Sequence, residues 1–164
     1  MTTRHKVTAC IISCCTLWAC AADVEPLPAL ASARVLEIVD GDTIVVTLGK
    51  NPVTIRLIGI DTPETKKPSW PVECFGPEAT TFIQSLIPPG TALILHRDVE
   101  SRDHFGRLLA YVFRHDDGLF VNQEIMTQGF ARPLSIAPNL TYSQEFAYWA
   151  GEARRERRGL WKAC

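Results

Sequence analysis

The stretch Thr43-Ile-Val-Val-Thr-Leu-Gly-Lys-Asn-Pro-Val-Thr-Ile-Arg-Leu-Ile-Gly-Ile60 decides the fold of this chain. It contains two runs rich in β-branched residues, 43–48 and 53–60, which are typical of strands. Gly49-Lys-Asn-Pro52 lies between them and is a turn signal. The stretch therefore predicts two strands that fold back on each other.

Further elements are predicted on both sides of this stretch. Residues 33–39 form a strand that precedes it, with Asp40-Gly41 as the hairpin turn. A helix follows, with Pro77 at its first position. Residues 91–96 and 107–114 are predicted as the fourth and fifth strands. The helix has one apolar face, made of Ala79, Phe82, Ile83, Leu86 and Ile87.

Two more helices are predicted near the C-terminus. Asn122 is a candidate N-cap for a short helix that ends at Gly129. Thr141 and Gln144 match a capping box for the last helix, and Gly159 fits its end. The order of elements indicates an α+β chain, mainly β, with a five-stranded antiparallel barrel of the OB-fold type and three helices. Such barrels bind oligonucleotides on one face.

The first 20 residues read as a secretory signal peptide. Arg4, His5 and Lys6 are cationic, residues 7–19 are almost wholly apolar or small, and Ala19-Cys20-Ala21 is a small-residue cleavage pattern. An uncleaved anchor is the alternative, but the apolar run is shorter than the roughly 20 residues of a membrane span. Residues 17–20 also resemble a bacterial lipoprotein box. Trp18 is bulky for that box, so lipidation of Cys20 stays an alternative to free secretion.

The rest of the chain divides into a linker, residues 21–32, and one domain, residues 33–164. Without the signal peptide, 15 basic and 18 acidic residues give a net charge of −3. Proteins that bind nucleic acid without specificity usually have a basic surface. Any contact with nucleic acid must therefore come from a local site and a bound cation, which counts against a pure binding module.

Cys74 and Cys164 are the two cysteines in the body of the chain. In an exported protein, two cysteines indicate one disulfide. It would close a loop of about 90 residues and contribute roughly 4–5 kcal/mol in the chain-entropy model. Two free thiols are the alternative, and a zinc site is not expected because no ligand lies at zinc spacing.

Three acids are predicted to meet at one rim of the barrel. Asp40 and Asp42 flank the first hairpin turn, and Asp61 ends the third strand at the same edge. Three carboxylates placed close together repel one another unless a cation neutralises them. Ca²⁺ accepts carboxylates and also a backbone carbonyl, which Thr62 can supply. Taken singly, each acid is better explained as a turn residue or a strand cap, and only the combination with Glu64 and two arginines favours a metal site.

Two arginines and a glutamate accompany these acids. Arg56 lies in the middle of an apolar strand, and Arg107 follows Gly106 at the start of the fifth strand. Arginine binds phosphate with two parallel hydrogen bonds and can offset charge that develops in a transition state. A structural ion pair for Arg56 and a surface position for Arg107 are the alternatives. Glu64 could orient or deprotonate a water, or it could be a solvated loop residue.

The motifs together resemble the staphylococcal nuclease (thermonuclease) family over residues 33–161. They are Asp40-Gly41-Asp42-Thr43, Arg56-Leu57, Asp61-Thr62-Pro63-Glu64-Thr65, Gly76-Pro77-Glu78-Ala79, and Asp103-x-x-Gly106-Arg107-x-x-Ala110-Tyr111. The resemblance implies a five-stranded OB barrel with three helices. It also implies a Ca²⁺-dependent phosphodiesterase that cleaves DNA and RNA and leaves 3′-phosphates.

The same resemblance implies a role for each site residue. Asp42, Asp61 and the Thr62 carbonyl match direct calcium ligands, and Asp40 matches an acid that acts through water. Arg56 and Arg107 match the phosphate-binding arginines, and Glu64 matches the acid that orients the attacking water.

The nucleotide pocket departs from the family pattern. His104-Phe105 stands where well-described members carry Lys-Tyr, and residues 133–137 lack their tyrosines. His104 and Phe105 are the candidate substrate-binding residues, although Phe105 can stack but cannot donate a hydrogen bond.

The combined expectation is an exported monomeric nuclease, secreted or periplasmic or lipid-anchored, with DNA and RNA as substrates. No stable protein partner is implied, and membrane contact is expected only with lipidation of Cys20. The alternative is a weak or inactive barrel that binds nucleic acid or protein.

Overall fold

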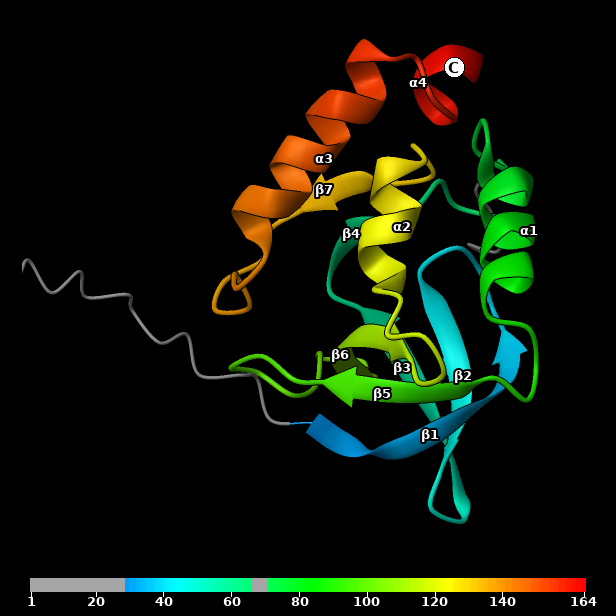
Figure 1. Cartoon of the computed structure of the whole chain (residues 1–164), viewed down its shortest axis with the longest axis vertical. Helices are drawn as coiled ribbons and strands as arrows, with labels where there is room; N and C mark the ends of the chain where they lie inside the picture. The colour runs from blue at the N-terminus through cyan, green and yellow to red at the C-terminus, as the bar shows by residue number, and fades with distance from the viewer. Residues whose placement is uncertain (1–28, 66–70) are drawn as a thin grey trace, which may run out of the picture.

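A computed structural model describes residues 29–65 and 71–164 of this chain (Figure 1). The predicted signal peptide, Cys20 and most of the predicted linker lie outside these residues. Figure 1 shows a β-barrel in its lower half, with the helices gathered above it. None of the helices in this described part is long and apolar enough to cross a membrane.

Five strands close into the predicted barrel. They are β1 (Ala29–Ile38), β2 (Thr43–Leu48), β3 (Asn51–Leu57), β5 (Ala92–His96) and β6 (Leu108–Arg114). They follow one another around the barrel in the order β1-β2-β3-β6-β5, and β1 pairs with β5 to close it. The prediction of a five-stranded OB-type barrel is therefore confirmed. β1 begins earlier than the predicted strand, because Ala29 and Leu30 pair with β5.

The expectation that every pair of strands is antiparallel is wrong for one pair. β3 and β6 run parallel, with Arg56 opposite Leu109. Parallel neighbours need a long crossover connection, and the chain between them here contains a short strand, a helix and β5. This parallel pairing brings Arg107, just before β6, beside the strand that carries Arg56.

The single strand predicted over residues 53–60 is also wrong, because it breaks after Leu57. Gly59 has φ +81°, and a β-carbon on it would lie 2.1 Å from the Phe146 ring. Only glycine fits this combination of left-handed backbone and close packing. The chain therefore leaves the barrel and forms β4 (Gly59–Asp61), which pairs with β7 (Arg132–Leu134), a strand that was not predicted.

The three predicted helices are all present. They are α1 (Gly76–Leu86), α2 (Val121–Thr127) and α3 (Ser143–Arg155), and a short α4 (Leu160–Ala163) follows Gly159. Figure 1 shows α2 above the barrel with α3 on one side of it and α1 on the other, and α3 alongside β7. Cys74, just before α1, is paired with Cys164 after α4, with 6.0 Å between their α-carbons. This agrees with the predicted pairing.

Both predicted helix caps are wrong, because tertiary contacts take these side chains. The residue before α2 is Phe120, and Asn122 is fully buried inside the helix. Its side chain accepts a hydrogen bond from the Val112 amide and donates one to the Ile58 carbonyl. Thr141 bonds Asp98 through both its amide and its hydroxyl, so it does not cap α3.

The hydrophobic core fills the barrel and continues under the helices. Alternate residues of the strands point inward, which follows from the two-residue period of a strand. The largest fully buried side chains include Ile44, Ile55, Leu57, Leu93 and Leu95 of the barrel strands. The rings of Tyr111 and Phe146 contact each other and extend this core to α3, and Phe146 packs against Gly59 of β4.

Candidate active site

All the residues predicted for metal binding and catalysis line one polar hollow of about 340 Å³. It lies where β2 begins and β4 ends. Its walls are formed by Asp40, Asp42, Thr43, Arg56, Asp61, Thr62, Pro63, Glu64, Glu73 and Arg107. Glu73 was not among the predicted residues.

Asp42 is the most deeply buried acid of the hollow, only 7% exposed. Its Oδ2 accepts hydrogen bonds from the amide and the hydroxyl of Thr62, at 3.0 and 3.2 Å. Its Oδ1 accepts one from the Thr43 hydroxyl at 3.0 Å. A β-carbon on Gly41 would lie 2.7 Å from Thr62 Oγ1. Gly41 therefore allows Thr62 to reach Asp42, a second role besides its place in the turn.

The other two acids, Asp40 and Asp61, have raised pKa values because of burial and of the negative charges crowded at this rim. Burial and the charge of Asp42 raise the pKa of Asp40 to about 6. Burial and the charge of Asp42 also raise the pKa of Asp61, with Arg56 and Arg132 acting in the opposite direction. Such shifts are expected where carboxylates crowd together without a cation.

The side chains present fit a hard cation in part. Asp42 Oδ2 already accepts two bonds from Thr62 and faces Arg56, whereas Oδ1 accepts one bond and keeps a lone pair for a metal. The Asp61 carboxylate is half exposed and can turn toward the hollow. Within residues 29–65 and 71–164, no three His, Cys, Asp or Glu side chains form a ready metal site. Calcium would therefore need carbonyl, water or phosphate oxygens as well, which it accepts readily.

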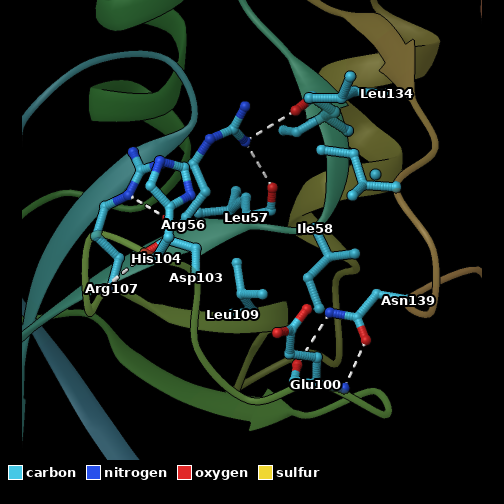
Figure 2. Close-up of a pocket in the computed structure, with 13 residues that line it drawn as sticks. Arg56, Leu57, Ile58, Glu100, Asp103, His104, Arg107, Leu109, Leu134 and Asn139 are labelled. Atoms are coloured by element: carbon cyan, nitrogen blue, oxygen red, sulfur yellow. Dashed lines mark hydrogen bonds and ion pairs between the residues drawn. The ribbon is translucent and has the colours of Figure 1, made fainter.

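Arg56 is held by the protein on several sides. Its Nη1 donates to the carbonyls of Leu57 and Ile60, at 2.7 and 2.8 Å. Its Nη2 pairs with Asp42 at 3.1 Å and with Asp61 at 3.5 Å, and the side chain is 13% exposed. The structural ion pair, one of the two interpretations of the sequence, is thus present. Figure 2 shows the guanidinium fixed by these carbonyls above Leu57.

Arg107 approaches the same hollow from the turn before β6. Asp103 accepts hydrogen bonds from the Arg107 amide at 2.9 Å and from its Nε at 2.7 Å. Gly106 has φ +82°, which lets this turn close. Burial alone would raise the pKa of Asp103, but the hydrogen bonds and charge of Arg107 outweigh it and lower that pKa. Asp103 therefore orients the arginine, and Nη1 lies 3.4 Å from the Thr43 hydroxyl.

Glu64 is half-buried and lines the hollow. Its Oε1 accepts a hydrogen bond from the Thr65 amide at 2.9 Å. Its own amide donates to Glu73 Oε2 at 3.3 Å, and its carbonyl accepts from the Glu73 amide at 2.9 Å. Glu73 thus holds Glu64 from the next segment of the chain. No sequence signal marked it, because it lies on an irregular segment before α1.

A second, mostly apolar cavity of about 320 Å³ opens beside the hollow and shares both arginines with it. His104, Leu109, Leu134 and Ile136 contribute to its walls. Figure 2 shows His104 beside the two arginines, with Leu134 on the opposite wall. At its lower end Glu100 and Asn139 are joined by two hydrogen bonds, at 2.7 and 2.9 Å.

Phe105 does not line this cavity. It is 72% exposed and packs against the Arg107 guanidinium, whose central carbon Cζ lies 5.4 Å from the centre of the Phe105 ring. His104 lines the cavity and Phe105 lines a neighbouring pocket, but the two rings are in contact, with 3.7 Å between their centres. Leu134 and Ile136 belong to the segment that lacks tyrosines, so that wall is apolar.

The closed five-stranded barrel and its helices place this chain among the OB-fold proteins. Residues 54–163 match the family described as staphylococcal nuclease homologue. The chain therefore belongs to the staphylococcal nuclease family, which confirms the resemblance seen in the sequence.

Individual relatives support the same family. The thermonuclease of Staphylococcus hyicus is 32% identical over 128 residues, which are 78% of this chain and 74% of that protein. The thermonuclease of Staphylococcus intermedius is 34% identical over 131 residues, 80% of this chain and 76% of that protein. The SPbeta prophage-derived endonuclease YokF of Bacillus subtilis is 39% identical over 124 residues, which are 75% of this chain but 41% of that protein.

Proposed function

We propose that this protein is a Ca²⁺-dependent nuclease that hydrolyses phosphodiester bonds of DNA and RNA and leaves 3′-phosphates. One observation carries the proposal: the acids, both arginines and Glu64 line a single hollow. The family membership and the names of the relatives, thermonuclease and endonuclease, support the same activity.

The residues of the hollow have different roles in the proposed reaction. Asp42, Asp61 and the Thr62 carbonyl would hold the calcium ion, with Asp40 acting through water. The bound ion would supply positive charge for the phosphate and its transition state. Arg107, oriented by Asp103, donates hydrogen bonds to a phosphate oxygen and offsets the charge that grows on it.

Arg56 can join this contact through the Nη2 edge that faces Asp61, because the 3.5 Å pair is the longer of its two ion pairs. Glu64 orients the attacking water. The water oxygen bonds to phosphorus, the bond from phosphorus to the 5′-oxygen breaks, and that oxygen leaves with a proton.

The adjoining cavity suits the nucleoside next to the scissile phosphate. It is lined mainly by apolar groups, and His104 supplies a polar edge. An apolar wall can pack against any base, so this pocket favours little base specificity.

Digestion of DNA and RNA with Ca²⁺ or with a chelator tests the activity. Wild-type protein should cleave only with the metal, and Glu64→Ala and Arg107→Ala should each lose about 100-fold or more of the rate. Glu78→Ala and Arg155→Ala are matched controls, because both wild-type side chains are exposed and outside the hollow. Wild-type rates for either active-site variant would contradict the mechanism.

An inactive barrel that binds nucleic acid is the second candidate. The guanidinium of Arg56 is already paired with Asp42 and Asp61 and is therefore less available to a phosphate, and this observation favours the second candidate. Binding without cleavage, insensitive to chelator, would support this candidate instead.

We also propose that the protein is exported and works as a monomer. The sequence of residues 1–20 and the surface pairing of Cys74 with Cys164 support export. Detection of the mature protein outside the cytoplasm, with or without a lipid on Cys20, tests this.

A further inference from the structure

We infer that Glu73 is a positioning residue that fixes Glu64 in the hollow through paired hydrogen bonds. The inference rests on the proposed nuclease function and adds a residue to it. Glu73 lines the hollow, but its hydrogen bonds to Glu64 are made to the backbone of that residue, so the role inferred for it is positioning and not direct participation in the reaction.

The two glutamates are joined in both directions. The Glu73 amide donates to the Glu64 carbonyl at 2.9 Å, and Glu73 Oε2 accepts from the Glu64 amide at 3.3 Å. The residues are nine positions apart, so this pair joins two separate segments of the chain. A backbone held at both its amide and its carbonyl has little freedom to rotate. The Glu64 side chain, which leaves that backbone, is then aimed at a defined place in the hollow.

The segment that carries Glu73 is itself well anchored. The Gly76 amide donates to the Glu73 carbonyl at 3.1 Å, and Cys74 is paired with Cys164. A β-carbon on Gly76 would lie 3.1 Å from the Glu64 carbonyl oxygen and 2.6 Å from the Thr65 methyl group. The start of α1 therefore packs directly on the irregular segment after β4 that carries Glu64, with Glu73 as the hydrogen-bonded link between them.

Positioning of this kind should appear in the chemical step. A misplacement of about 1 Å in a group that orients a nucleophile can cost on the order of 100-fold in rate. Substrate affinity depends instead on the arginines, which Glu73 does not contact in the hydrogen bonds described. Loss of Glu73 should therefore lower kcat and leave KM nearly unchanged.

Three variants separate positioning from a general effect of charge. Glu73→Ala removes the acceptor, and we expect kcat to fall by about 10- to 100-fold with KM unchanged. Glu73→Gln keeps a side-chain oxygen that can accept from the Glu64 amide, so it should retain most of the wild-type kcat. Glu78→Ala removes the same charge from an exposed position in α1 and should match wild type.

Amide hydrogen exchange at Glu64 provides a readout that needs no activity. With its acceptor removed in Glu73→Ala, this amide should exchange about 10-fold faster than in wild type or in Glu73→Gln. Equal kcat in Glu73→Ala and Glu78→Ala would overturn the inference, and so would a kcat in Glu73→Gln as low as in Glu73→Ala. If wild-type protein does not cleave, the proposed function fails, and the exchange rates still decide whether Glu73 holds Glu64.

Discussion

Replacement of Asn122 by alanine should destabilise the protein strongly, because this side chain joins two parts of the structure. Asn122 is fully buried in α2. It accepts from the Val112 amide of β6 at 2.9 Å and donates to the Ile58 carbonyl at 2.8 Å. Ile58 lies between β3 and β4, immediately before the strand that ends at Asp61. The amide therefore connects the barrel, α2 and the rim of the hollow.

The size of the effect follows from the groups left behind. Asn122→Ala leaves one amide and one carbonyl buried without these partners, and each costs about 1–3 kcal/mol. Alanine favours the helix by roughly 0.5 kcal/mol and offsets a small part of that cost. We expect a net loss of about 2–5 kcal/mol in the free energy of unfolding. With a urea m-value of about 2 kcal/mol per M, the midpoint should fall by about 1–2.5 M.

Urea unfolding monitored by circular dichroism measures this loss. Gln123→Ala, at the next position of the same helix, is the control and should change the free energy of unfolding by less than about 0.5 kcal/mol. The two variants should show the same m-value as wild type. A loss below about 1 kcal/mol in Asn122→Ala would refute the reasoning, because it would mean that water or a small shift satisfies both backbone groups.

Three further predictions concern the hollow and its surroundings. Gly41→Ala should displace Thr62 from Asp42 and cost about 1–3 kcal/mol of stability and much of the nuclease activity. Gly151→Ala, the control with open space around its β-carbon, should stabilise α3 by about 0.5–1 kcal/mol, and urea unfolding and cleavage assays compare the two variants. Because the pKa of Asp103 is lowered in the folded protein, its charged form stabilises the fold above the ordinary pKa of 3.8, and this stability is lost as the pH falls through the lowered pKa. Unfolding curves measured between pH 5 and 2 should therefore show that Asp103→Asn loses less stability on acidification than wild type. Mass spectrometry of the native, non-reduced protein should show Cys74 and Cys164 resistant to alkylation and a mass about two hydrogens lower than that of the reduced chain, and two alkylated thiols would contradict the pairing.

The barrel was predictable because its signals are local. Runs of β-branched residues define β2 and most of β3, and a one-faced apolar pattern defines α1. The proximity of Asp40, Asp42 and Asp61 was predictable from the geometry of a meander, because the turn before the second strand and the end of the third strand lie at the same edge of the sheet. The predicted residues therefore lie together in the structure.

The errors occur where a distant residue decides the local structure. Gly59 breaks the third strand because the Phe146 ring, 87 positions later, occupies the space beside it. Thr141 looked like a helix cap, but Asp98 takes both of its donors. Glu73 gave no signal at all, since only the folded chain places it against Glu64. A sequence pattern that spans about ten residues does not show contacts with residues far away in the chain.

Arg56 shows how one residue can satisfy two interpretations of the same sequence. Carboxylates that crowd together repel one another and weaken a fold, and an arginine between the buried Asp42 and the half-exposed Asp61 reduces that repulsion when no cation is present. A cation and a phosphate arriving together would bring both signs of charge into the hollow. The acids could then turn to the cation and Nη2 to the phosphate, so that each charged group would keep an opposite charge beside it. The ion pair and the phosphate contact are therefore compatible as two states of one site, with the two carbonyls on Nη1 holding the guanidinium in place in both.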